Sequence, residues 1–175
     1  MDESDPQNHC VLGMAYFYMG NHEKAVATLQ HAVEIDPNSA TALHWLATCL
    51  TKPESAQEVI ALMEKAIRVN PLDKKFLAMC AHRLGRTYGL LGKYKKAAEE
   101  YEKSLRIRPN RWGTLLWLTA VYVHLGREKD ARATAREVMR LNPSFLLEDF
   151  EKRVPYTDQA MKENDFRAWR KAGLK

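Results

Sequence analysis

The chain has 175 residues and a formal net charge of +5, and its 46% hydrophobic and 28% charged residues are the balance of a folded globular protein. Its eight glycines and seven prolines are too few for a turn-rich β protein, and its longest mostly apolar stretch, residues 113–126, is too short to cross a bilayer. The start, MDESDPQNHC, lacks the basic and apolar regions of a secretory signal, and three cysteines without CxxC spacing predict no disulfide framework, so we expect a cytoplasmic protein with no membrane partner.

Charge is distributed unevenly along the chain. Residues 1–37 contain one lysine and six carboxylates, whereas residues 72–109 contain ten basic and four acidic groups. Solvated helix faces would explain this polarity, and so would attraction to an acidic partner. The sequence leaves both explanations open.

Four prolines follow similar residues along the chain, in EIDPN, RVNPL, RIRPN and RLNPS. Pro37, Pro71, Pro109 and Pro143 are 34, 38 and 34 residues apart, and a period of 34 residues is typical of an array of two-helix repeats. We therefore predict a repeat domain over residues 1–145, with copies at about 6–39, 40–73, 74–111 and 112–145.

Two of the copies depart from the common pattern. In the second, Pro53 suits the first turn of the second helix. The third has four additional residues in PLDKKFLAMC, about one helical turn, and Asp73 is a good N-cap. We expect its first helix to be lengthened to residues 74–91.

Residues 146–175 are predicted to form a cap of two helices that closes the apolar end of the array. A short helix after Pro143 is expected to turn Phe145, Leu146 and Phe150 towards the core. A second helix, from Asp158 to about Ala172, is ended by Gly173. Its apolar side consists of Met161, Phe166 and Trp169, which we expect to be packing residues.

Small residues and tyrosine-like residues recur at fixed places in the four copies. The eighth place holds Gly13, Ala47, Gly85 and Thr119; the eleventh holds Tyr16, Leu50, Tyr88 and Tyr122; the twentieth holds Ala25, Val59, Ala97 and Ala131. Short side chains let two antiparallel helices approach closely. The pattern resembles the tetratricopeptide repeat family. The resemblance implies an all-α, right-handed solenoid of four helix–turn–helix repeats, in which the first helices line a concave groove.

Carrying the groove positions of that family over gives a candidate binding site for a protein or peptide partner. The residues at these positions are Cys10, Met14, Phe17, His44, Thr48, Met79, His82, Arg86, Leu116 and Ala120; Gly89 occupies a further position. The polar and basic centre of this set favours an acidic partner. Alternatively, Met79 and Leu116 are only packing residues beneath the C-terminal cap and bind no partner. Cys10 and Met14 replace the Lys and Asn of the carboxylate clamp, so a chaperone C-terminus is not expected to bind.

No motif predicts catalysis, a metal or another cofactor. The six histidines show no HExxH spacing, and the glycines of GRTYGLLG do not follow a strand. The basic segments KYKK and RIRPNRW carry aromatic residues at helix starts, where packing explains them, so nucleic acid is not an expected partner. We predict that the protein is not an enzyme.

The two ends of the array suggest further partners. The first helix, with Leu12, Ala15 and Met19, has no preceding repeat to cover it, so either upstream protein or a second chain is expected there.

The closing residues RVPYTD and KAGL resemble the C-terminal repeat regions of bacterial class III adenylate/guanylate cyclases and related signalling regulators. The sequence thus predicts a protein-interaction module. The alternative is the regulatory C-terminal region of a larger bacterial signalling protein, a nucleotide cyclase or transcription regulator with its effector domain upstream.

Overall fold

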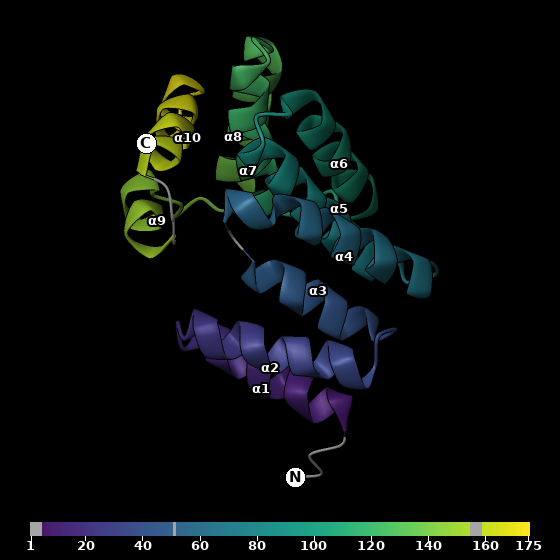
Figure 1. Cartoon of the computed structure of the whole chain (residues 1–175). Coiled ribbons are helices and arrows are strands. Elements are labelled where there is room, and N and C mark those ends of the chain that lie inside the picture. Colours follow the sequence, from purple (N-terminus) through teal and green to yellow (C-terminus); the bar gives the residue numbers. More distant parts are fainter. Residues whose placement is uncertain (1–4, 51, 155–158) are drawn as a thin grey trace. The chain divides into compact units, whose positions relative to one another are not determined.

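The computed structural model describes residues 5–50, 52–154 and 159–175, and within these residues it is helical, without a strand (Figure 1). The helices are α1 (Pro6–Tyr18), α2 (His22–Ile35), α3 (Ala40–Cys49), the 3₁₀ helix η1 (Pro53–Ser55), α4 (Ala56–Val69), α5 (Lys74–Leu90), α6 (Tyr94–Ile107), α7 (Trp112–His124), α8 (Glu128–Leu141), α9 (Leu147–Arg153) and α10 (Gln159–Lys171).

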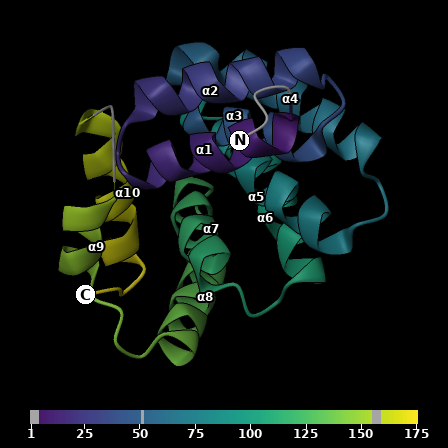
Figure 2. The ribbon, with the colours of Figure 1, turned by 90° about the horizontal axis from the view of Figure 1, so that it is seen from below.

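The chain divides into two compact units, residues 1–84 and 85–175, and the boundary falls inside α5. In the first unit α1, α2, α3 and α4 pack in order of sequence, and α1 and α2 lie side by side (Figures 1 and 2). Their close approach depends on Gly13, because a Cβ there would lie 2.5 Å from Cγ of the buried Leu29. Small residues at the repeat positions therefore set the helix spacing, as the pattern predicts.

The second unit has the larger core. Helix α7 lies at its centre and packs against α6, α8 and α10. The largest fully buried side chains of this unit come from five helices: Tyr101, Leu116, Leu118, Val138, Leu147, Phe166 and Trp169. Burying a large apolar side chain raises the free energy of unfolding by about 1.5–3 kcal/mol. Leu147, Phe166 and Trp169 of α9 and α10 therefore supply a substantial part of the stability of this unit.

Helix ends follow from local chemistry. The Asp73 side chain accepts a hydrogen bond from the Phe76 backbone N–H at 3.0 Å, and α5 extends from Lys74 to Leu90, as the four additional residues predict. Gly92 has a φ of 65° just beyond the end of α5, a left-handed conformation that a residue with a Cβ rarely adopts. Pro53 opens the short helix η1, and α4 itself begins at Ala56.

One expectation for the tail is wrong. Leu146 is 55% exposed, and Leu147, which is 1% exposed, takes the core position instead. Leu146 has extended backbone angles and α9 begins only after it. Because successive side chains of an extended segment point to opposite sides, Phe145 and Leu147 share the core side and Leu146 faces outward. The Asp158 cap expected for α10 lies outside the described residues.

Two glycines of α5 differ in their surroundings and provide a matched test of the packing. A Cβ on Gly85 would lie 2.8 Å from ring atoms of the buried Tyr101, whereas a Cβ on Gly89 would meet nothing within 4 Å. We expect Gly85→Ala to lower the free energy of unfolding by about 1 kcal/mol, because overpacking outweighs the gain in helix propensity. Gly89→Ala should raise it by about 0.5–1 kcal/mol. Urea unfolding followed by circular dichroism measures both, and shifts of the same sign would contradict the packing.

Candidate functional site

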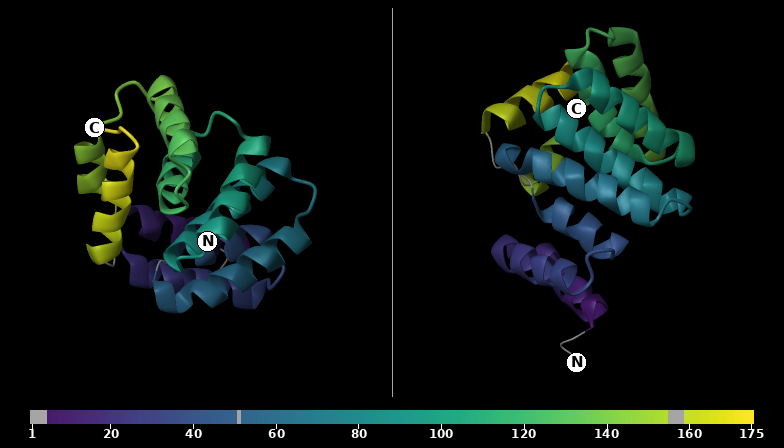
Figure 3. Two further views of the ribbon diagram at one scale, coloured as in Figure 1. Left: turned by 90° about the horizontal axis from the view of Figure 1, so that it is seen from above. Right: turned by 45° about the vertical axis from the view of Figure 1, so that its right-hand side comes forward.

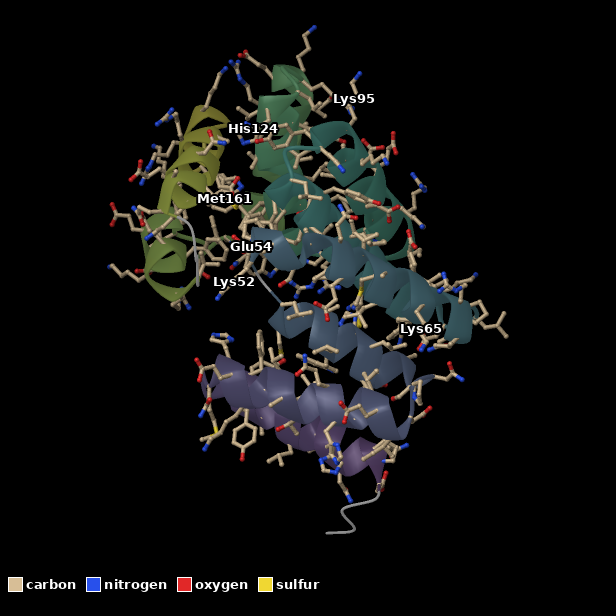
Figure 4. All side chains as sticks on the ribbon, viewed as in Figure 1. Lys52, Glu54, Lys65, Lys95, His124 and Met161 are labelled. Carbon is tan, nitrogen blue, oxygen red and sulfur yellow. The ribbon has the colours of Figure 1, made fainter. Side chains whose placement is uncertain are left out.

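A cavity of about 520 Å³ lies within the second unit. Its walls come from the last turns of α5, from the first turns of α6, from α7 and from α10. We call it the tail cavity and define it by Arg86, Gly89, Tyr94, Trp117, His124 and Asp165, with Met161 and Asn164 on the α10 side. Figure 4 shows His124 on α7 and Met161 on α10, on the sides by which these helices face each other.

The second half of α10 is held firmly against α7. The Trp169 indole Nε1–H donates a hydrogen bond to the Leu116 carbonyl at 2.6 Å, and the Trp169 ring meets Trp117 edge to face at 5.0 Å between centroids. The C-terminus is tied to α9 by a hydrogen bond from the Leu147 N–H to the Lys175 carbonyl, and α9 and α10 lie side by side (Figures 2 and 3). This anchoring leaves the first half of α10 as a wall of the cavity.

Arg86 brings a positive charge to the cavity. Its guanidinium carbon lies 3.5 Å from the centroid of the Trp117 ring, so the planar group stacks on the indole. Within the described part of the chain, no carboxylate lies within 4 Å of this guanidinium. Stacking fixes the orientation of Arg86 and leaves its N–H donors available to an incoming acceptor.

His124 forms the opposite side of the cavity together with α10. Its ring stacks on Tyr94, with centroids 4.4 Å apart and an interplanar angle of 18°. The Nε2 atom lies 3.9 Å from a carboxylate oxygen of Asp165 and 3.5 Å from the amide nitrogen of Asn164. The Asp165 carboxylate therefore faces a group of its own chain.

Three of the predicted groove residues are buried in the first unit. Cys10 packs with Ala32 and Ala42. The His44 Nδ1 atom lies 4.0 Å from the Cys80 sulfur, and the Thr48 hydroxyl donates to the His44 carbonyl at 2.8 Å. These side chains contact their own chain, so they offer a partner little surface.

The other predicted residues fall into two groups. Met14, Phe17, Met79 and His82 are half-buried in the first unit, and their role in binding stays a prediction. In the second unit, Leu116 and Ala120 are each 1% exposed, on the helix that α10 covers. Only Arg86 and Ala120 of the ten meet in the tail cavity, where Gly89 also lies.

Sequence reasoning missed Trp117, His124 and the α10 residues of the cavity. Two signals could have pointed to them. Trp117 follows a predicted groove residue directly, and the apolar stripe of Met161, Phe166 and Trp169 requires a helix to pack against. Nothing in the sequence identifies that helix as α7.

The described residues offer few other kinds of site. No group of three or more His, Cys, Asp or Glu side chains among them could hold a metal ion. In the same residues, no helix combines the length and the apolar character needed to cross a membrane.

The sequence matches two family models over most of the predicted repeats. A tetratricopeptide repeat model matches residues 38–110, and a TPR repeat model matches residues 13–49. These residues are tetratricopeptide repeats. None of the curated protein sequences is similar enough to this chain to count as a match.

Solved structures with the same repeats are similar to this chain. The crystal structure of MamA superposes with a TM-score of 0.67 at 23% identity, over 87% of this chain and 84% of that one. The MamA 41-end structure from Desulfovibrio magneticus RS-1 gives 0.68 at 14% identity, over 98% and 92%. A chain of the APC/C hetero-tetramer Cut9–Hcn1 gives 0.78 at 21% identity, over 86% of this chain and 30% of that one. These likenesses confirm the predicted fold class, an all-α tetratricopeptide-repeat solenoid. The resemblance of the closing segment to cyclase regions stays a prediction.

Trp169 is the side chain whose loss should damage the second unit most. It is completely buried and makes both the hydrogen bond to Leu116 and the ring contact with Trp117. We expect Trp169→Ala to lower the free energy of unfolding by about 3–5 kcal/mol. Arg136→Ala, at an exposed position of α8, should change it by less than about 0.5 kcal/mol and serves as the control. Equal melting temperatures for the two variants would contradict the anchoring of α10.

Cysteine reactivity tests the burial in the first unit. Burial raises the pKa of the Cys49 thiol to about 11, and burial also raises the pKa of the Cys10 thiol. The thiolate is the reactive form, and about one in a thousand Cys49 side chains is ionised at pH 8. We expect the native chain to react with a disulfide reagent such as DTNB at pH 8 at least about a hundredfold more slowly than the urea-unfolded chain. Rapid release of three equivalents from the native chain would show that the thiols are accessible.

Proposed function

We propose that the protein is an interaction module that holds an acidic segment of a partner protein at the tail cavity. The observation that carries this proposal is the Arg86 guanidinium, stacked on Trp117 at the cavity without a carboxylate partner among the described residues. A positive group that is oriented by its own chain and left unpaired favours a carboxylate from outside.

The remaining charges at the cavity support the same sign of ligand. Arg167 also lines the cavity and makes no ion pair within the described part of the chain. The two acidic lining residues, by contrast, contact their own chain: Asp165 faces His124, and Glu163 accepts a hydrogen bond from the Gln159 amide at 3.2 Å. Both arginines therefore have no ionic partner among the described residues, whereas each carboxylate already contacts a side chain of its own chain.

The shape of the cavity favours an extended segment. Gly89 and Ala120 contribute almost no side-chain bulk, whereas Tyr94 and Trp117 provide aromatic surface. Gly89 is not required by internal packing, since a Cβ there would meet nothing within 4 Å. Gly89 is the next-to-last residue of α5, where alanine would also fit, and close approach of a ligand backbone would explain why a glycine is present.

The fold supports the broader statement that this is a protein-interaction scaffold. The Cut9–Hcn1 structure is that of a hetero-tetramer, so a protein with this fold assembles there with a different chain. The half-buried groove residues of the first unit, Met14, Phe17, Met79 and His82, would offer a partner a separate contact. The regulatory-tail alternative stays a prediction.

A peptide selection tests the proposal. Peptides of about nine residues, displayed as a random library, are selected on the immobilised full chain, and we expect enrichment of Asp and Glu next to an apolar residue. For a selected peptide, Arg86→Glu should weaken binding at least about tenfold, because it replaces attraction with repulsion. Gly89→Ala should also weaken binding, although it stabilises the helix.

Arg136→Glu is the matched control, because it makes the same charge reversal on α8, outside the cavity. Its affinity should stay within about twofold of the unchanged chain. Enrichment of basic peptides, or equal affinities for the Arg86→Glu and Arg136→Glu variants, would refute the proposed site.

A further inference from the structure

Helix α1 has an apolar face that the described chain leaves open. Helix α1 contains no Asp, Glu, Lys or Arg between Pro6 and Tyr18, and it carries apolar residues on every side. The side turned away from α2 exposes Val11 (64%), Leu12 (39%), Tyr18 (73%) and Met19 (76%), with the exposed Ala15 between them. Spacings of one, four, seven and eight residues place these five on one stripe, which we call the α1 face.

This face is unlike the rest of the protein surface. Five of the nine large hydrophobic side chains that are exposed among the described residues belong to α1, its C-cap residue and α2: Val11, Leu12, Tyr18, Met19 and Ile35. The other four come from separate places in the sequence, in α4, the α4–α5 loop, α8 and the residue before α9. A contiguous apolar stripe of this kind marks an interaction site.

We infer that a second copy of this chain covers the α1 face, with the two α1 helices packed against each other in antiparallel orientation about a twofold axis near Ala15. This inference goes beyond the proposed function and does not depend on it. Among the residues that the structure describes, only α1 presents such a face. In the second unit, helices α8, α9 and α10 carry surface ion pairs, including Lys171–Glu128, Arg170–Glu151 and Lys162–Glu151. A head-to-tail contact would bury apolar side chains against charges, whereas a twofold contact pairs the apolar face with itself.

The charges at the two ends of α1 decide the orientation. Asp5 caps the N-terminus of α1, and Lys24, in the first turn of α2, lies over the ring of Tyr16 near the C-terminal end of α1. An antiparallel pair brings Asp5 of each chain towards Lys24 of the other, and it also opposes the two helix dipoles favourably. A parallel pair would place Asp5 beside Asp5. The face itself carries no Asp, Glu, Lys or Arg.

The size of the face sets the strength of the dimer. A helix of 13 residues is about 20 Å long, and a standard stable interface buries about 800 Å² on each partner. The α1 face alone is smaller than this. We therefore expect a reversible dimer whose proportion rises with protein concentration over the micromolar range.

A cysteine at the proposed axis gives the sharpest test. Ala15→Cys places two thiols opposite each other in the dimer, and under mild oxidation we expect a covalent dimer of the full chain to form at least about tenfold faster than in the control. The control is Ala61→Cys, at another exposed alanine inside α4 and away from the face. The three native cysteines are buried and should not contribute.

A second substitution keeps the test decisive. Val11→Glu added to Ala15→Cys should reduce cross-linking to the rate of the control, and Val11→Glu alone should keep the chain monomeric in sedimentation velocity where the unchanged chain shows dimer. Circular dichroism checks that the variants remain folded. A chain that is monomeric up to about 1 mM would overturn the inference. So would a dimer that neither cross-links through residue 15 nor responds to Val11→Glu, because a different surface would then hold it together.

Discussion

The hydrogen bond from the Trp169 indole to the Leu116 carbonyl, together with the packing of Trp169 on Trp117, holds the tail helix against α7. The rest of the site depends on this contact. It buries the predicted groove residues Leu116 and Ala120, and it leaves the first turns of α10 free to form a cavity wall. The same Trp117 ring carries the Arg86 guanidinium on its surface. The Trp117 ring therefore contacts both Trp169, which anchors α10, and Arg86, which supplies the positive charge at the tail cavity.

The sequence was sufficient to predict the helical pairs and several of their ends, because these depend on local chemistry. Asp73 caps α5, and Gly92 allows the chain to leave it. Leu146 was assigned to the core wrongly, since one extended residue before α9 reverses the direction of its side chain. Such an error is typical of a short helix, where a shift of one residue at its start changes which side chains face inward.

The site was harder to predict, because a periodic pattern shows which side of a helix is covered but does not identify the segment that covers it. Cys10, His44 and Thr48 lie at groove positions of the family, yet this chain buries them. Gly85 and Gly89 form a GxxxG in the sequence and look equivalent. Only the three-dimensional surroundings distinguish them, since the Tyr101 ring fills the space beside Gly85 and the space beside Gly89 is empty.

The two proposed contacts use different chemistry and belong to different units. The tail cavity offers an oriented positive charge and aromatic surface, so electrostatic attraction contributes to selectivity and is weakened by salt. The α1 face is uncharged, so its association depends on apolar burial and is insensitive to salt. A dimer formed through α1 would contain two tail cavities. A partner that repeats its acidic segment could then bind both, and its avidity would exceed the affinity of either cavity without any additional contact.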